Sequence, residues 1–219
     1  SQAREVGESI RDHVNRELTE WAREEHGVES RLELELEKVY RRFFLPNVRG
    51  GGEGSKKRYA GDRETGGEPE LELVGLEAVR RDWPEAGRRF QTELLRRAFR
   101  AEDVDGYVFE FVRSLRRGEL DGDLVYRKVL RKDPDEYVKA SPPHVRAARR
   151  AGLGKGAAVR YVIRPDGPTP VGRDESVPSG LDHDHYVSRV LQPIADAILP
   201  FLGKRFEEIS GDDPQLTLF

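Results

Sequence analysis

The chain has 219 residues, 36% of them hydrophobic and 36% charged, with 41 Asp and Glu against 38 Lys and Arg, a formal charge of −3. This balance excludes a wholly basic nucleic-acid binder, so a DNA contact must come from local patches. The absence of cysteine excludes disulfides and thiolate metal sites, and no apolar run reaches membrane-spanning length. We expect a soluble, cytoplasmic protein of one or two domains.

The first third of the chain predicts an α+β unit. Val6 to Ala22 carries apolar residues at helical spacing, which predicts one buried stripe. Arg31 to Tyr40 alternates Leu and Glu, the pattern of a half-buried strand. Shorter strands are expected at Phe43–Leu45, Lys57–Gly61 and Glu70–Val74. Together these elements predict a small antiparallel sheet with one packed helix.

The rest of the chain is mainly helical in pattern. Asp82 is placed to cap a helix that runs to about Phe99, and the change from strands to helices near Trp83 predicts a domain boundary. Further helices are expected at Val104–Leu115, which Gly118 ends, at His144–Ala151, and at Asp184–Phe206, which Pro193 and Pro200 break. Extended segments are expected at Leu124–Leu130 and Val159–Ile163, the latter ending in a turn at Pro165–Pro168.

The most informative motif is the basic run Lys56-Lys57-Arg58-Tyr59, which follows a glycine-rich turn. Adjacent cations followed by an aromatic ring suit a surface that binds a nucleic-acid backbone. The alternative interpretation is a solvated edge strand whose lysines deter aggregation. The surrounding motifs favour the first.

These motifs follow one another in a familiar order. Leu34-Glu35-Leu36-Glu37, the basic run, Gly75 to Trp83, Pro142-Pro143-His144-Val145, Val159 to Ile163, and His185-Tyr186 through Gln192-Pro193 together resemble the C-terminal part of bacterial B-family DNA polymerases. The resemblance implies that residues 1–82 are the last part of a palm, 83–210 a thumb, and 211–219 a tail. The chain contains no methionine, and opening directly into a helix is what we expect of an excised fragment.

The resemblance also implies which residues bind primer–template DNA. Lys56, Lys57, Arg58 and Tyr59 would lie on a palm strand beside the duplex, and Arg80 and Arg81 at the entry to the thumb. Residues of the thumb that would line duplex phosphates are Arg127, Lys128, His144, Arg146, Arg149 and Lys155. Taken singly, each of these cations can equally be part of a solvated helix face.

The catalytic residues of such an enzyme are expected elsewhere. Two-metal phosphoryl transfer needs two aspartates that hold Mg²⁺, and the Tyr-Gly-Asp-Thr-Asp hairpin of the family does not occur in this sequence. Asp103-Val104-Asp105 is the nearest string but opens a helix. Glu37 would be a peripheral palm carboxylate, or only the solvated side of its strand. We therefore expect the parent enzyme to use Mg²⁺, and the fragment to bind no metal and to be inactive alone.

The tail Gln215-Leu216-Thr217-Leu218-Phe219 resembles the peptide by which family members bind the bacterial sliding clamp. Gln215 would form hydrogen bonds, and Leu218 and Phe219 would enter an apolar pocket beside Leu216. A tail folded onto its own core is the alternative. The predicted partners are thus duplex DNA and the clamp, with the fragment a nucleoid-associated monomer.

Two other functions remain open from the residues alone. A free-standing DNA-binding clamp adaptor without catalysis is the main alternative. A metal-dependent nuclease would combine the Glu strand with His183 and His185, although Asp182 or Asp184 fits better as a helix cap. A Ser-His-Asp hydrolase has no support, because no nucleophile-elbow pattern surrounds a serine.

Overall fold

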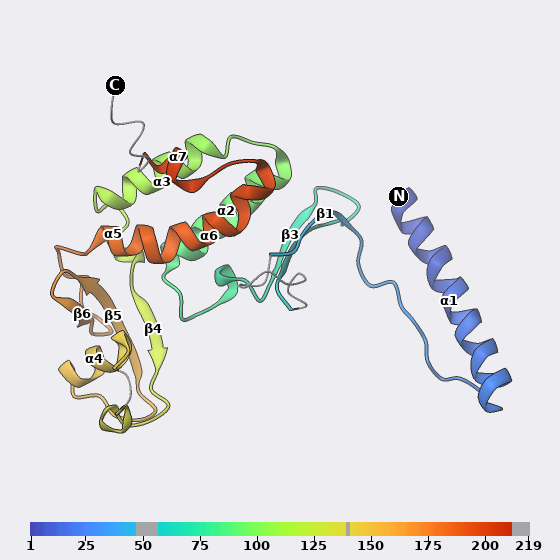
Figure 1. Ribbon diagram of the computed structural model, residues 1–219, viewed down its shortest axis with the longest axis horizontal. Coiled ribbons are helices and arrows are strands. Elements are labelled where there is room, and N and C mark those ends of the chain that lie inside the picture. Colours follow the sequence, from blue (N-terminus) through green and yellow to red (C-terminus); the bar gives the residue numbers. More distant parts are fainter. Residues whose placement is uncertain (47–56, 139–140, 212–219) are drawn as a thin grey trace. The chain divides into compact units, whose positions relative to one another are not determined.

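The computed structural model describes residues 1–46, 57–138 and 141–211 (Figure 1). Its internal contacts divide the chain into two compact units, residues 1–43 with 61–72 and residues 44–60 with 73–219. Helices and two small three-stranded sheets make up these units, so the predicted α+β class is confirmed. In the described part of the chain, no helix is long and apolar enough to cross a membrane.

The N-terminal helix α1 spans Gln2–His26, which confirms the predicted helix. Ser1 caps its first turn, and Gly27, with φ of 63°, ends it in the left-handed conformation that favours glycine. The predicted burial of its apolar stripe is wrong for three residues, because Val6, Ile10 and Trp21 are each more than half exposed. Helical spacing shows that one face of a helix is apolar, but it does not show whether another element covers that face.

The strand predicted over residues 31–40 is also wrong, because among them only Tyr40 belongs to a strand. The backbone of Leu34 binds the side chain of Asn15 on α1 instead, donating its N–H at 2.7 Å and accepting at 3.0 Å. Leu36 packs against Gly7, where a β-carbon would lie 3.0 Å from the leucine side chain. The segment with alternating Leu and Glu therefore contacts helix α1 and does not form the predicted strand.

The first sheet contains β1 (Tyr40–Phe44), β2 (Tyr59–Arg63) and β3 (Glu70–Val74), in that order. The three short strands predicted from the sequence are thus confirmed, with ends shifted by a few residues. Gly61 is required on β2, because a β-carbon there would lie 2.3 Å from the ring of Tyr40. The ring of Tyr40 packs on the backbone of Gly61, which has no side chain.

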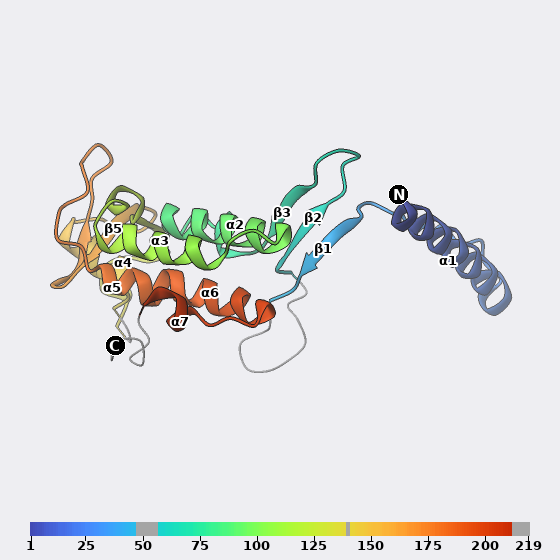
Figure 2. The ribbon, with the colours of Figure 1, turned by 90° about the horizontal axis from the view of Figure 1, so that it is seen from above.

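The second unit has a helical layer in which α2 (Glu85–Arg100), α3 (Asp105–Arg116) and α6 (Gln192–Ile198) lie side by side (Figure 2). The short helix α7 (Phe206–Ser210) packs on α3. Buried side chains of this layer include Phe90, Leu94, Val108, Leu115, Ile194 and Phe206. Gly118, with φ of 76°, follows α3 as predicted.

The cap predicted for α2 is wrong. The helix begins at Glu85 after Pro84, and no side chain caps it. Asp82 instead accepts two hydrogen bonds from the guanidinium of Arg80. A carboxylate within reach of a guanidinium fork gains a bidentate, charge-assisted pair, which is stronger than one hydrogen bond to a backbone N–H.

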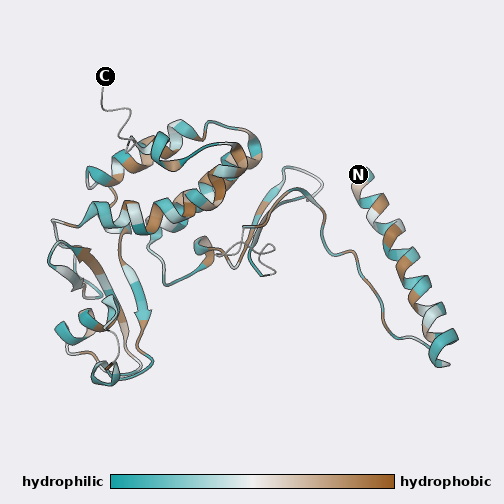
Figure 3. Ribbon diagram, viewed as in Figure 1, coloured by the Kyte–Doolittle hydropathy of each residue, from teal (hydrophilic) through white to brown (hydrophobic). Residues whose placement is uncertain are grey.

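The remainder of this unit is an antiparallel sheet of β4 (Tyr126–Val129), β5 (Ala158–Arg164) and β6 (Gly167–Pro170), on which α4 (Pro143–Arg150) packs (Figure 1). The strand β6 was not expected, because Gly167 and Pro168 were assigned to a turn. Apolar colour follows β5, whereas β4 is mostly hydrophilic (Figure 3). The hydroxyl of buried Tyr186 accepts a hydrogen bond of 2.7 Å from Ile163 N–H, which ties this sheet to the helical layer.

The prediction that Pro193 breaks the last helical region is wrong. The chain runs from α5 (His183–Tyr186) through one π-helical stretch, Val187–Leu191, directly into α6. A proline lacks the N–H and crowds the preceding turn, and the wider π turn accommodates it without a break. Pro200 lies in a 3-10 turn, Leu199–Leu202, that does end the helix.

Candidate nucleic-acid interface

The basic run enters β2. Lys56 lies outside the described residues, whereas the side chain of Lys57 is exposed and those of Arg58 and Tyr59 are partly buried. Gly75 follows β3 with φ of 64°, and a β-carbon there would lie 2.2 Å from the carbonyl oxygen of Lys57. A glycine at this position therefore allows the backbone that carries the cations to pass close to the end of β3.

Arg58 forms an ion pair with Glu77, which lies in the 3-10 turn Glu77–Val79. The second carboxylate oxygen of Glu77 accepts a hydrogen bond of 2.8 Å from Gln91 of α2. Gln91 is 2% exposed and its carbonyl accepts from Ala78 N–H at 2.6 Å. This chain of contacts fixes the position of the Arg58 guanidinium relative to α2.

Arg80 and Asp82 form a second fixed pair, with nitrogen–oxygen distances of 3.0 and 2.8 Å. The hydrogen bonds from Arg80 lower the pKa of the Asp82 carboxyl, although partial burial opposes them. Lys128 of β4 places its Nζ 4.0 Å from the same carboxylate. Arg81 is exposed and, among the described residues, has no carboxylate partner.

A cavity of about 420 Å³ brings these groups together. Residues that were far apart in the sequence line it: Arg58, Glu77, Arg80, Asp82, Trp83, Tyr126, Lys128 and Tyr161. Three cations therefore meet three aromatic rings around two carboxylates. Burial raises the pKa of Tyr161 to about 12, so this hydroxyl remains a neutral hydrogen-bonding group at pH 7. Cations beside aromatic faces are typical of surfaces that bind nucleic acid.

His144 and Arg146 lie on α4. His144 packs edge-on against Tyr137, with ring centroids 6.2 Å apart. Partial burial, with a smaller contribution from the charge of Lys128, lowers the pKa of His144. It is therefore a neutral group at pH 7 and not a cation, whereas Arg146 is exposed on the same helix.

The paired carboxylates and histidines do not form a metal site in the described residues. Glu37 is exposed in the irregular segment after α1, and no group of three His, Asp or Glu side chains in the described ranges could hold a metal ion. His183 binds Asp121 at 2.7 Å, while His185 binds the hydroxyl of Tyr126 at 3.2 Å. Asp182 caps α5 by accepting from His185 N–H, as predicted.

The tail residues proposed to bind the clamp, Gln215, Leu216, Leu218 and Phe219, lie outside the described residues. Their role stays a prediction.

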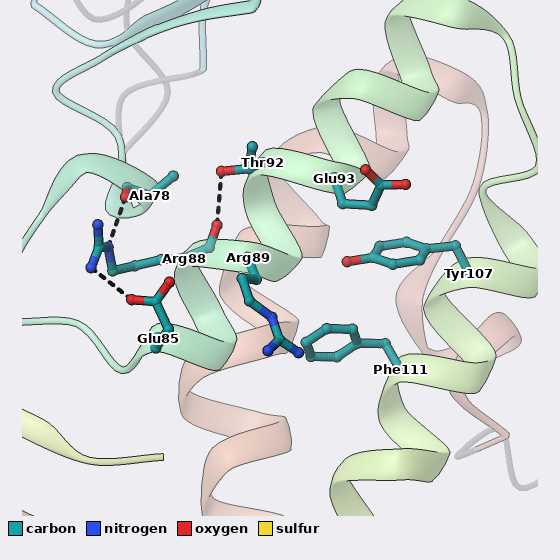
Figure 4. A pocket seen from close by; sticks show the side chains of 8 residues that line it. All are labelled: Ala78, Glu85, Arg88, Arg89, Thr92, Glu93, Tyr107 and Phe111. Atoms are coloured by element: carbon teal, nitrogen blue, oxygen red, sulfur yellow. Dashed lines mark hydrogen bonds and ion pairs between the residues drawn. The ribbon is translucent and has the colours of Figure 1, made fainter. Parts of the chain in front are cut away.

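A further cavity, of about 500 Å³, lies between α2 and α3 and has a different balance of charge (Figure 4). Arg88 donates to Glu85 and to the carbonyl of Ala78, and Arg89 donates to Asp123 at 2.6 Å. Tyr107 and Phe111 point into it from α3. Two arginines and two glutamates line this cavity, so it has no excess of positive charge, whereas three cations and two carboxylates line the 420 Å³ cavity.

Charge is distributed unevenly along the chain. Residues 126–173, here called the basic region, hold twelve Lys and Arg against four Asp and Glu, a formal charge of +8. Residues 1–39, here called the acidic region, hold six against eleven, a formal charge of −5. The net charge of the whole chain hides this separation, which motif analysis of single cations also missed.

Sequence reasoning missed the aromatic side of the 420 Å³ cavity. Trp83 was recognised only as part of a motif, and Tyr126 and Tyr161 were assigned to strands without a role. Their cavity depends on the pairing of β4 with β5, in which these two tyrosines are direct partners. A pairing register between distant strands has no local signal in the sequence.

Comparison with known proteins identifies the family of this chain. Residues 1–164 match the family model of DNA polymerase family B. The chain is 40% identical over its whole length to DNA polymerase II of Escherichia coli (strain K12), of which it covers 28%, and 32% identical over 85% of its length to DNA polymerase 2 of Aeropyrum pernix, of which it covers 24%. The family B DNA polymerase of Pyrobaculum calidifontis superposes with a TM-score of 0.60 and 29% identity, over 88% of this chain and 25% of that one.

The fold is α+β, and cations and aromatic rings line one of its cavities. The family match defines the protein further: this chain belongs to DNA polymerase family B. It spans about a quarter of the length of these three relatives.

Proposed function

We propose that this chain holds primer–template duplex DNA for a family B polymerase, as its remaining palm (1–82) and its thumb (83–210). The observation that supports this most is the meeting of Arg58, Arg80 and Lys128 with Trp83, Tyr126 and Tyr161 around one cavity. Cationic side chains that contact the phosphate backbone bind DNA without regard to its sequence, which suits an enzyme that must move along its product. Lys56, Lys57, Tyr59, Arg81, His144 and Arg146 would make further contacts with the duplex.

The parent enzyme would add deoxynucleotides to a primer with two Mg²⁺ ions. No group of carboxylates among the described residues could hold the two Mg²⁺ ions. We therefore assign no catalytic step to residues of this chain. Glu37 would act only from the periphery. We expect no primer extension by the 219-residue chain with Mg²⁺ and deoxynucleotides, and extension would overturn this part of the proposal.

Fluorescence anisotropy with a labelled duplex tests the DNA contact. We expect binding at low salt that weakens by at least tenfold between ~50 mM and ~200 mM salt, because several phosphates release counterions. The double variant Lys57→Ala/Tyr59→Ala should bind more weakly than the parent chain. Binding that hardly changes with salt, or an unchanged affinity of the variant, would exclude the proposed surface.

Clamp binding is the second part of the proposal. Gln215, Leu216, Leu218 and Phe219 would tether the polymerase to the sliding clamp, because an apolar tail end flanked by acids suits insertion into a partner's apolar pocket. Deletion of residues 215–219 should abolish co-elution with a purified bacterial clamp while duplex affinity stays the same. Clamp binding that survives the deletion would refute this assignment.

A further inference from the structure

The largest of the cavities described, about 700 Å³, lies on the sheet of the basic region, and of the residues that line it only Arg127 is among the DNA-contacting cations named above. It is lined by residues of β4, β5, β6 and the segments that follow α4 and β6: Arg127, Ala151, Leu153, Ala158, Arg160, Pro170, Val171, Gly172 and Arg173. Three arginines thus surround an apolar floor, and none of the residues that line the cavity is a carboxylate.

Two of these arginines stand directly opposite each other across the sheet. Arg127 of β4 pairs with Arg160 of β5 in the antiparallel register. Like charges at directly opposed positions destabilise a sheet by a few tenths of a kcal/mol or more. The arrangement therefore does not serve the stability of the fold, and an anion between the two side chains would remove the repulsion.

Arg160 is held in place. Its Nη1 donates to the carbonyl oxygens of Gly172 at 2.8 Å and Arg173 at 2.7 Å, and its Nε–H and Nη2 groups form no hydrogen bond with other described residues. Glu175, an acid close to the cavity, accepts from Gly172 N–H at 2.8 Å and, among the described residues, forms no ion pair with the three arginines. A guanidinium fixed by backbone carbonyls is pre-organised for an oxyanion and loses little side-chain entropy on binding.

We propose that Arg127, Arg160 and Arg173 form a phosphate-binding site that takes a backbone phosphodiester group of the bound nucleic acid. The inference rests on the proposed function for the identity of the ligand, and on the opposed arginines for the chemistry. Guanidinium groups bind phosphate oxygens through paired N–H donors. The apolar floor, with Leu153 and Val171, keeps water from one side of the ion pairs and so strengthens them.

The first experiment compares the double variant Arg127→Gln/Arg173→Gln with Arg89→Gln, both by anisotropy with a labelled duplex. Arg127 and Arg173 are exposed, so the variant should fold, and loss of Arg127 should not lower the Tm because it removes the opposed charge. We expect about tenfold weaker binding and a slope of log affinity against log salt reduced by about 2. Arg89 pairs with Asp123 and lies outside both proposed DNA contacts, so its variant should bind like the parent chain.

Equal affinity and slope in the double variant and the parent chain would overturn the site while leaving the proposed function intact. If the parent chain itself binds no duplex, the proposed function fails, and titration with inorganic phosphate decides the site separately. Phosphate-dependent shifts of the Arg160 Nε–H resonance that vanish in the double variant would support phosphate binding but overturn the nucleic-acid ligand. An unchanged resonance would overturn both.

Discussion

The acidic region and the basic region are similar in length and both rich in charge, but they are built differently. In the acidic region, Leu32 is 69% exposed, and the segment after α1 is held to the helix by hydrogen bonds of Asn15 and by the contact of Leu36 with Gly7. In the basic region, α4 packs on the sheet and Leu130, Val145, Val159 and Val162 are at most 1% exposed. The comparison shows that the density of charge in a region does not indicate how well the region is packed. The number of buried apolar side chains does.

The largest expected effect tests this difference in packing. Leu130→Ala in the basic region should lower the free energy of unfolding by about 2 to 5 kcal/mol, because a buried leucine leaves a cavity. The matched variant Leu32→Ala in the acidic region should change it by no more than about 0.5 kcal/mol. Urea unfolding followed by circular dichroism measures both. Comparable losses in the two variants would show that the two regions are packed alike.

A second experiment tests the difference in charge. Arg80→Gln/Lys128→Gln removes two cations of the 420 Å³ cavity and should weaken duplex binding about tenfold at low salt, with a shallower salt dependence. Arg4→Gln/Arg11→Gln removes the same charge from the acidic region and should bind duplex like the parent chain. If both double variants lose affinity equally, overall charge and not the cavity governs binding.

The smallest effect concerns pH. Burial lowers the pKa of His144 in the folded state, whereas the unfolded chain protonates near about 6.5. As the pH falls through this value, the unfolded state takes up the proton first, so stability decreases slightly below about pH 6.5. His144→Gln should make the urea midpoint less dependent on pH between about 7 and 5.5. A parent midpoint that rises on acidification relative to the variant would contradict this sign.

Much of the fold was predictable where a pattern is local. Helical spacing, Gly118 and Pro142-Pro143 located α1, α3 and α4, and the short strands of the first sheet were found to within a few residues. The errors fall where a competing contact decides. In the expected strand at 31–40, the backbone of Leu34 forms hydrogen bonds with Asn15 and not with another strand. Asp82, expected to cap α2, accepts hydrogen bonds from Arg80.

The candidate site was only half predictable. Arg58, Arg80 and Lys128 were identified singly as DNA-binding cations, and the structure brings them to one cavity with aromatic residues that no motif had indicated. Arg160 and Arg173 were missed altogether. An arginine on a strand looks the same in sequence whether it faces a carboxylate, solvent or another arginine.

By itself, the sequence determined the α+β class, most of the elements and the resemblance to B-family polymerases, because helical and strand periodicity and ordered motifs are properties of neighbouring residues. Only the tertiary structure decided which cations are neutralised and which remain available. Arg88 and Arg89 meet Glu85 and Asp123, whereas Arg127 meets Arg160. The physical reason is that the interaction between two charges depends on their distance and on the solvent between them, and strand register and helix packing set both.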